Sequence, residues 1–170
     1  KRVALVHDWL NGMRGGEKVF EALCELFPDA TVFTLFYEPS RVSERIRRMR
    51  VVESGLGRLP GARSRYRWLL PLFPRAVEQF PTADFDLVVS SSHCVAKAAH
   101  PPARGGGAHI CYCHTPMRYI WDAFDIYFPR EGAECEVWAD APLGGRAGDP
   151  RNPAIPQRIK RMALRRAALA

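Results

Sequence analysis

Residues 3–23, VALVHDWLNGMRGGEKVFEAL, begin with the pattern of a β-strand and end with the pattern of an α-helix. The first residues are almost all apolar, whereas Val19, Phe20 and Leu23 recur at the spacing of one helix face. Between the two patterns lie a His-Asp pair, an arginine and three glycines: His7, Asp8, Arg14, Gly12, Gly15 and Gly16. This direct succession of strand and helix predicts an α/β unit with glycines where the helix must start.

Gly15 and Gly16 allow two interpretations. Their backbone can come close to a ligand while the first free N–H groups of the helix point at an anion such as a diphosphate or a carboxylate. Alternatively, the glycines only make a tight turn between strand and helix. The motif is neither G-x-G-x-x-G nor a Walker A motif. His7, Asp8 and Arg14 in the same loop favour a site, although His7 and Asp8 could equally be a hydrogen-bonded structural pair.

Four further apolar runs have the length of strands, at residues 31–36, 51–53, 87–90 and 109–113. Apolar strands separated by helices are typical of a parallel sheet that is covered on both faces. Right-handed crossovers then predict a Rossmann-like, doubly wound parallel sheet, in which ligands bind outside the carboxyl ends of the strands. The polar loops at residues 7–16, 90–93 and 114–116 each follow a strand, which is the strongest indication of a site.

The chain divides into three parts by composition. Residues 1–128 carry the strand and helix patterns, including helical candidates at residues 63–80 and 116–128. Pro71 and Pro74 must break or kink the first of these candidates. Residues 129–156 are rich in Gly, Pro, Ala and Asp without periodicity, which predicts a functional or disordered loop. Residues 157–170 have the pattern of a basic helix, which we expect to continue into a further segment.

The overall composition predicts a globular protein with anionic partners. The 170 residues are 47% hydrophobic and 25% charged, with a net charge of +7 that suits nucleic acid, anionic lipid or phosphorylated metabolites. No apolar run has the length of a membrane span. Five cysteines without a framework spacing indicate reduced thiols and a cytosolic location.

The segment HICYCHTPMRYIWD, residues 109–122, contains two cysteines and a histidine near a strand end. Cys111 and Cys113 share one face of the strand and His114 points away, and no second ligand pair is present, so buried thiols are favoured over a zinc site. His114 stands where the strand ends, a position that suits proton transfer or a hydrogen bond to a polar substrate. Packing of His114 on Tyr119 or Trp121 is the structural alternative.

The segment SSSHCVAK, residues 90–97, places three hydroxyls and an imidazole after the fourth strand. This pattern indicates recognition of a polyol or a phosphate, with Lys97 near the following helix. A nucleophilic serine is not favoured because there is no G-x-S-x-G elbow. Capping of a helix N-terminus by Ser91 or Ser92 is the structural alternative.

Arginines are concentrated in residues 41–75, in two groups that precede a strand and an aromatic, apolar segment. Arginine interleaved with aromatic residues can lie in a membrane interface. No nucleic-acid reader motif is present, so nucleic acid is not the expected partner. A solvated basic face over a buried apolar side is the structural alternative.

Three of these stretches together resemble one family. VALVHDWLNGMRGGEKVFEALCELFPDA, DLVVSSSHCVAKAA and HICYCHTPMRYIWD are similar, in this order, to the N-terminal domain of family 4 (group 1) retaining glycosyltransferases of the GT-B fold. The resemblance covers residues 1–128 and fades from 129 to 156, and residues 158–170 look like the start of a family segment that continues into another strand. It implies that the Rossmann-like sheet is the N-terminal, acceptor-binding half of a GT-B architecture.

The resemblance also implies roles for individual residues. Gly15 and Gly16 match the glycine loop that approaches the donor diphosphate or the acceptor, and Asp8 and Asn11 belong to the same acceptor-side loop. His114 matches the histidine that contacts the donor sugar and helps to orient the reaction. The further substrate-binding candidates are Ser91, Ser92, Lys97 and Arg118.

By this resemblance, the expected function is transfer of a hexose from a nucleotide-diphosphate sugar, the co-substrate, to a glycan or lipid-linked acceptor in polysaccharide biosynthesis. The scheme needs neither a cofactor nor a metal, because backbone dipoles and basic side chains can supply the positive field. The family's second, donor-binding domain, with its Lys/Arg pair and E-x7-E motif, has no counterpart here, so residues 1–170 alone should be inactive. We expect a cytoplasmic protein, peripheral on the inner face of the membrane. A non-catalytic anion- or nucleotide-binding Rossmann module and a basic membrane-surface protein are the alternatives.

Overall fold

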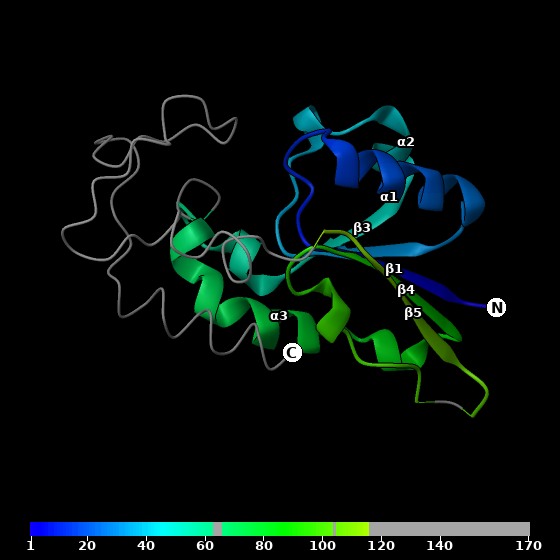
Figure 1. Ribbon diagram of the computed structural model, residues 1–170. Coiled ribbons are helices and arrows are strands. Elements are labelled where there is room, and N and C mark those ends of the chain that lie inside the picture. The colour runs from blue at the N-terminus through cyan, green and yellow to red at the C-terminus, as the bar shows by residue number, and fades with distance from the viewer. Residues whose placement is uncertain (63–65, 104, 116–170) are drawn as a thin grey trace.

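Five parallel strands form the sheet that organises the protein (Figure 1). The computed structural model describes residues 1–62, 66–103 and 105–115. The strands are β1 (Val3–His7), β2 (Thr31–Thr34), β3 (Arg50–Glu53), β4 (Leu87–Ser92) and β5 (Ala108–Cys113). Their spatial order is β3-β2-β1-β4-β5. The chain therefore moves outward from β1 to β3, returns to the other side of β1 with β4, and continues outward to β5.

Helices cover both faces of this sheet. Figure 1 shows α1 (Gly15–Leu26) and α2 (Glu44–Arg48) on one face and α3 (Phe73–Glu78) on the other. Alternate residues of each strand therefore meet different helices. Leu5, Val32 and Val89 pack with Phe20 on the α1 face, and the other face has its own cluster, which includes Ala4, Val6, Phe33, Phe73, Val77 and Val88. These two layers make an α/β, Rossmann-like fold.

The helix α1 forms where the sequence predicts it, because its apolar positions recur on one face. Phe20 and Cys24 are buried, and Leu23 packs beside them. The short helix α2 was not predicted. It begins after Ser43, whose Oγ accepts a hydrogen bond from the Ile46 N–H at 3.4 Å, as an N-cap does.

The predicted strands agree with the observed ones to within a few residues at each end. β2 ends two residues earlier than predicted, and β4 continues two residues further, through Ser92. Within the predicted helix at residues 63–80, a 3-10 segment, Tyr66–Leu72, changes into α3 beside Pro71 and Pro74. The candidates at residues 116–128, 129–156 and 157–170 lie outside the described residues.

The order of the strands brings the carboxyl ends of β1, β4 and β5 side by side. His7 on β1 is in register with Ser91 on β4, and Ser92 is in register with Cys113 on β5. The strand order reverses between β1 and β4, and such a switch point is where open α/β sheets bind ligands. Within the described residues, no helix combines the length and the apolarity needed to cross a lipid bilayer.

Candidate functional site

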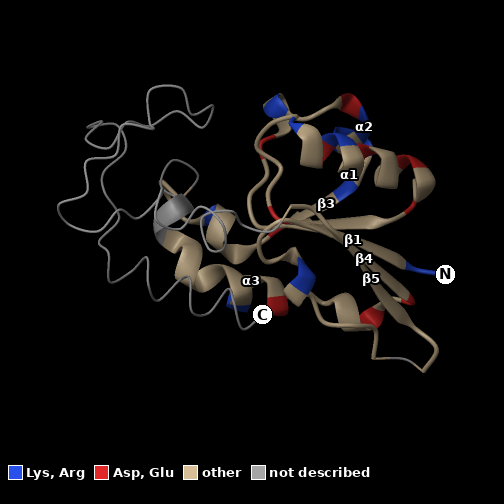
Figure 2. Cartoon of the chain, in the orientation of Figure 1, with Lys and Arg blue, Asp and Glu red and all other residues tan. Residues whose placement is uncertain are grey.

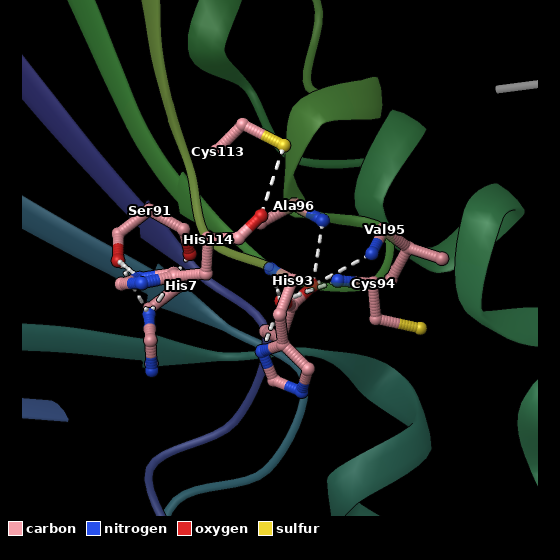
Figure 3. A network of polar contacts seen from close by, with 9 residues as sticks. His7, Ser91, His93, Cys94, Val95, Ala96, Cys113 and His114 are labelled. Atoms are coloured by element: carbon pink, nitrogen blue, oxygen red, sulfur yellow. Dashed lines mark hydrogen bonds and ion pairs between the residues drawn. The ribbon is translucent and has the colours of Figure 1, made fainter. Parts of the chain in front are cut away.

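Four residues from distant parts of the chain meet at the carboxyl edge of the sheet, on the α1 side. His7 ends β1, Ser91 lies near the end of β4, His114 follows β5, and Gly16 is in the first turn of α1. Figure 3 shows His7, Ser91 and His114 grouped together at this edge. A Cβ atom added to Gly16 would lie 3.7 Å from His114 Nε2 and 3.8 Å from His7 Cε1. We call these four residues the His114 group.

Hydrogen bonds within the His114 group fix the nitrogen of His7 that carries a proton and allow a matching assignment for His114. The Ser91 carbonyl can only accept, so His7 Nδ1–H, 2.9 Å away, must donate to it. Ser91 Oγ lies 3.2 Å from His7 Nδ1 and 2.8 Å from His114 Nε2. Because His7 Nδ1 carries a proton, the Ser91 hydroxyl does not need to donate to His7. The hydroxyl can instead donate its proton to His114 Nε2. The neutral His114 ring then carries its proton on Nδ1, which has no hydrogen-bond partner among the described residues.

Burial disfavours the charged form of both imidazoles of the group. Burial lowers the pKa of His7, and the nearby Asp8 and Glu17 carboxylates offset only part of that effect. The pKa of His114 is lowered first by burial and then by the charge of His93, against the same two carboxylates. His7 is fully enclosed and stacks on Phe20 of α1, with ring centroids 4.7 Å apart.

The two glycines at the start of α1 differ in their surroundings. A Cβ atom on Gly15 would meet nothing within 4 Å, whereas one on Gly16 would touch both imidazoles at van der Waals distance. Neither glycine has a positive φ; among the described glycines only Gly61 and Gly106 do. The backbone of the turn therefore does not require glycine, which argues against the tight-turn interpretation. The absence of a side chain at Gly16 keeps space beside His114.

Glu17 is a member of this site that the sequence analysis missed. Its side chain is buried, and its Oε2 accepts a hydrogen bond from the Arg14 N–H at 3.0 Å. A carboxylate three residues after the N-cap completes one half of a capping box and complements the helix dipole. Its position in sequence, directly after two glycines at a helix start, was the signal that could have revealed it.

Asp8 has a different environment from the one expected. Its carboxylate is fully buried and accepts four backbone N–H groups of the turn after β4, at 2.7–3.0 Å, from residues His93, Cys94, Val95 and Ala96. Asp8 does not pair with His7, because neighbouring strand residues point to opposite faces. The sequence suggested that Ser91 or Ser92 caps this turn. In the structure Asp8 accepts the N–H groups of the turn and caps it instead.

Burial by itself raises the pKa of Asp8, but the hydrogen bonds from His93, together with smaller electrostatic interactions with the His93 and His7 rings, outweigh it and lower that pKa to about 2. The carboxylate is therefore ionised at neutral pH, and its oxygens are already occupied by the turn. Asp8 thus has a structural role, and direct contact between Asp8 and a substrate stays a prediction.

The other predicted residues are placed as follows. Ser92 is buried on the α3 side of the sheet, and its Oγ has no hydrogen-bond partner in the described part of the chain. Asn11 Oδ1 is likewise buried and unpartnered there.

Lys97 is exposed on the 3-10 turn Ala96–Ala98, and none of the contacts described here joins it to the His114 group. Arg118 lies outside the described residues, as do Tyr119 and Trp121.

The prediction that Cys111 and Cys113 are buried was wrong. Both thiols are exposed, because β5 is the edge strand of the described sheet. They are in register with Ser90 and Ser92, so they share one face of the sheet as predicted. No group of metal-ligating side chains occurs among residues 1–62, 66–103 and 105–115.

The arginines around α2 are partly paired with acidic residues. Arg45 lies 3.4 Å from Glu25 of α1, and Arg48 pairs with Glu44 one helical turn away. Figure 2 shows positive and negative side chains intermixed along α1 and α2. This pairing reduces the net positive charge that α2 presents to a partner. Arg63 and Arg65, from the second arginine group, lie outside the described residues.

Comparison of the chain with protein-family models, with curated proteins and with solved structures gave no match. The functional assignment therefore depends on the residues and on the geometry of the site.

Proposed function

We propose that this protein is the acceptor-side domain of a retaining glycosyltransferase, which moves a hexose from a nucleotide-diphosphate sugar to a glycan or lipid-linked acceptor. The observation that carries the proposal is the His114 group. Gly16, Ser91 and His114 come from the three stretches that resemble the family, and they meet at the switch point of the sheet. Residues that are far apart in sequence and converge at one edge of a sheet are typical of a functional site.

In this proposal His114 contacts the transferring sugar. Its Nε2 is engaged by the Ser91 hydroxyl, so Nδ1–H is the atom that donates a hydrogen bond to a sugar oxygen. Ser91 and His7 are positioning residues, because they fix the tautomer and the orientation of the ring. A neutral donor suits a sugar hydroxyl or ring oxygen better than a charged one, because burial here disfavours the imidazolium.

The diphosphate of the donor would lie at the start of α1. The N–H groups of Gly15 and Gly16 are the first of the helix, where intrahelical acceptors are lacking. The buried Glu17 carboxylate is close to this point and is turned to the Arg14 N–H. Repulsion from Glu17 would weaken a diphosphate held by this domain alone. The proposal therefore includes a second domain that supplies the family's Lys/Arg pair and E-x7-E motif, and it expects no turnover from residues 1–170 alone.

The proposed location is cytoplasmic, at the inner face of the membrane, where a lipid-linked acceptor is accessible. Exposed arginines of the α2 region, such as Arg41 and Arg47, would supply the attraction to anionic lipid. Sedimentation with liposomes that contain anionic lipid should show binding that falls as the salt concentration rises. Binding that is insensitive to salt would contradict a charge-driven attachment.

The function is tested with the full-length gene product and radiolabelled UDP-, GDP- and ADP-hexoses. We expect transfer of label from one of these donors to a lipid or glycan extract, and a loss of this transfer in His114→Ala. The control is His109→Ala, which removes an imidazole near the start of β5 that bonds to Ser90 on the opposite face. The proposal fails if no donor is consumed, or if His114→Ala retains nearly full activity.

The alternative of a non-catalytic nucleotide-binding module is supported by the first N–H groups of α1, which have no acceptor within the helix. Calorimetry of residues 1–170 with UDP, GDP and ADP distinguishes the two. Tight binding of a nucleotide by this domain alone, without any transfer by the full-length protein, would favour the module.

A further inference from the structure

A second polar pair lies on the other side of the same sheet edge. The Asp8 carboxylate and the His93 imidazole are joined by a contact of 3.0 Å between Oδ2 and Nδ1. Asp8 is completely buried, whereas the His93 side chain is 35% exposed. In Figure 3 the His93 ring lies to the right of the His7, Ser91 and His114 side chains. None of the roles proposed above uses His93.

The contact with Asp8 fixes the chemistry of the His93 ring. An ionised carboxylate can only accept hydrogen bonds. His93 Nδ1 must therefore carry a proton and donate it in a hydrogen bond to Asp8 Oδ2. In the neutral ring Nε2 then has a free lone pair and accepts a hydrogen bond. Among the described residues Nε2 has no hydrogen-bond partner. The four backbone N–H groups that donate to Asp8 tie this turn, which carries His93, to the end of β1.

The surroundings of the pair suit a ligand that has both apolar and hydroxyl groups. The half-buried Trp9 lies beside His93 with ring centroids 4.5 Å apart, and it also contacts Phe73 of the core. Two polar atoms of the adjoining sequence, Ser92 Oγ on the residue before His93 and Asn11 Oδ1 three residues after Asp8, are buried without a hydrogen-bond partner in the described part of the chain. Buried polar atoms normally have partners, so these two atoms suggest that a bound group completes them. A site with aromatic surface and a few convergent polar groups is typical of small polar ligands.

We infer that Asp8 and His93 form a hydroxyl-binding subsite on the α3 side of the sheet edge, separate from the His114 group, in which His93 Nε2 accepts a hydrogen bond from a hydroxyl of a sugar or polyol. The identification of that hydroxyl as part of the acceptor depends on the proposed glycosyltransferase function. His93 contacts the ligand, and Asp8 is a positioning residue that orients the ring. A phosphate would not fit as well, because the buried Asp8 carboxylate beside the ring repels an anion.

Two substitutions separate binding from structure. In His93→Asn the side-chain amide can occupy the place of Nδ1 and donate to Asp8, so the turn is retained while the acceptor at Nε2 is lost. In His93→Gln the longer side chain reaches the place of Nε2 and offers an amide oxygen, but it gives up the Nδ1 position. The matched control is His109→Gln, which removes a partly buried imidazole that bonds to Ser90 through one nitrogen.

The experiment uses ¹⁵N NMR of the histidine rings in residues 1–170, titrated with methyl α-D-glucopyranoside and methyl α-D-mannopyranoside. We expect the neutral His93 ring to carry its proton on Nδ1, as the contact with Asp8 requires, and a glycoside to shift the Nε2 resonance. His93→Asn should raise the half-saturating glycoside concentration about tenfold, His93→Gln should raise it less, and His109→Gln should leave it unchanged. A proton on Nε2 of the neutral ring, or equal glycoside binding by His93→Asn, would overturn the subsite.

Kinetics of the full-length enzyme separate this inference from the function on which it depends. His93→Asn should raise the KM for the acceptor about tenfold and leave the KM for the nucleotide sugar unchanged. If transfer occurs and His93→Asn leaves the acceptor KM unchanged, the subsite is wrong and the glycosyltransferase stands. If glycosides bind through His93 but no nucleotide sugar is consumed, the subsite stands as a sugar site and the glycosyltransferase proposal is wrong.

Discussion

Asp8 Oδ1 lies 2.7 Å from the backbone nitrogen of Ala96, which follows it by 88 residues in the chain. Together with the N–H groups of residues 93–95, this bond ties the end of β1 to the turn after β4. The buried Asp8 carboxylate therefore links β1 and β4, the two strands between which the order of the sheet reverses. The His114 group and the His93 ring both lie beside this carboxylate.

The first prediction concerns this carboxylate. Asp8→Ala should lower the free energy of unfolding by roughly 3–5 kcal/mol, because four buried N–H groups and the His93 ring lose their acceptor. Urea denaturation followed by circular dichroism measures the change. Asp29→Ala, which removes an exposed carboxylate, should change the stability by less than about 0.5 kcal/mol. A loss below about 1 kcal/mol in Asp8→Ala would mean that the turn is stable without Asp8.

The second prediction is a loss of stability in acid. Burial lowers the pKa of His7 in the folded protein, so the unfolded chain binds more protons below its ordinary pKa of about 6.5. This part of the free energy of unfolding should therefore be fully present well above that value and fall steadily as the pH decreases below it. Asp8, with its pKa lowered to about 2, should remove further stability only as the pH falls below about 4.

His7→Phe tests the assignment of this pH dependence. The phenyl ring can still pack on Phe20, but it cannot titrate or donate to the Ser91 carbonyl. We expect a loss of about 1 kcal/mol at neutral pH and a flatter pH dependence below about pH 6.5. An unchanged slope would assign the acid sensitivity to another group.

The third prediction concerns the space beside His114. Gly16→Val should abolish activity in the full-length protein, because its methyl groups occupy the space next to the two imidazoles. The fold should be largely retained, since Gly16 has no positive φ. Circular dichroism, activity and the NMR signals of the His114 ring measure these effects. Gly55→Val, at a described position where a Cβ meets nothing within 4 Å, is the control. Unfolding of Gly16→Val would instead support the tight-turn interpretation.

The fourth prediction compares neighbouring serines on β4. Ser91→Ala should lower the activity of the full-length enzyme about tenfold, because it removes the hydroxyl that orients His114, whereas His114→Ala should lower it roughly 100-fold. Ser90→Ala is the matched control, because Ser90 Oγ bonds His109 on the opposite face. NMR of the His114 ring should show a mixture of tautomers in Ser91→Ala. Equal activities of the two serine variants would contradict the role of Ser91.

The layout of the sheet was predictable because it depends on local patterns. Each strand is a short apolar run, and α1 has the periodicity of an amphipathic helix, so the chain could be divided correctly around residues 3–7 and 87–92. The convergence of the loops after β1, β4 and β5 was also predictable, since parallel strands share one carboxyl edge. The short helix α2 was missed because five residues carry too little periodicity to recognise.

The polar contacts at that edge were less predictable. His7 and Asp8 are adjacent in sequence, and the sequence allowed a pair between them, but the pleat of β1 sends them to opposite faces. Asp8 then reaches a turn that is more than eighty residues away, and the role expected for Ser91 or Ser92 as a cap passes to Asp8. The exposure of Cys111 depends on the place of β5 at the edge of the described sheet, which no local pattern encodes.

The sequence by itself therefore determined the parallel α/β architecture and the three loops that make the site, because periodicity and strand ends are local properties of the chain. Only the tertiary structure decided which side chains in those loops meet. The register of β1 against β4 places His7 beside Ser91 and leaves Asp8 to bind residues 93–96, and the position of α1 brings Gly16 against His114. Those contacts depend on the packing of elements that are distant in sequence. For this physical reason two polar groups, the His114 group and the Asp8–His93 pair, lie at a sheet edge where the sequence indicated a single site.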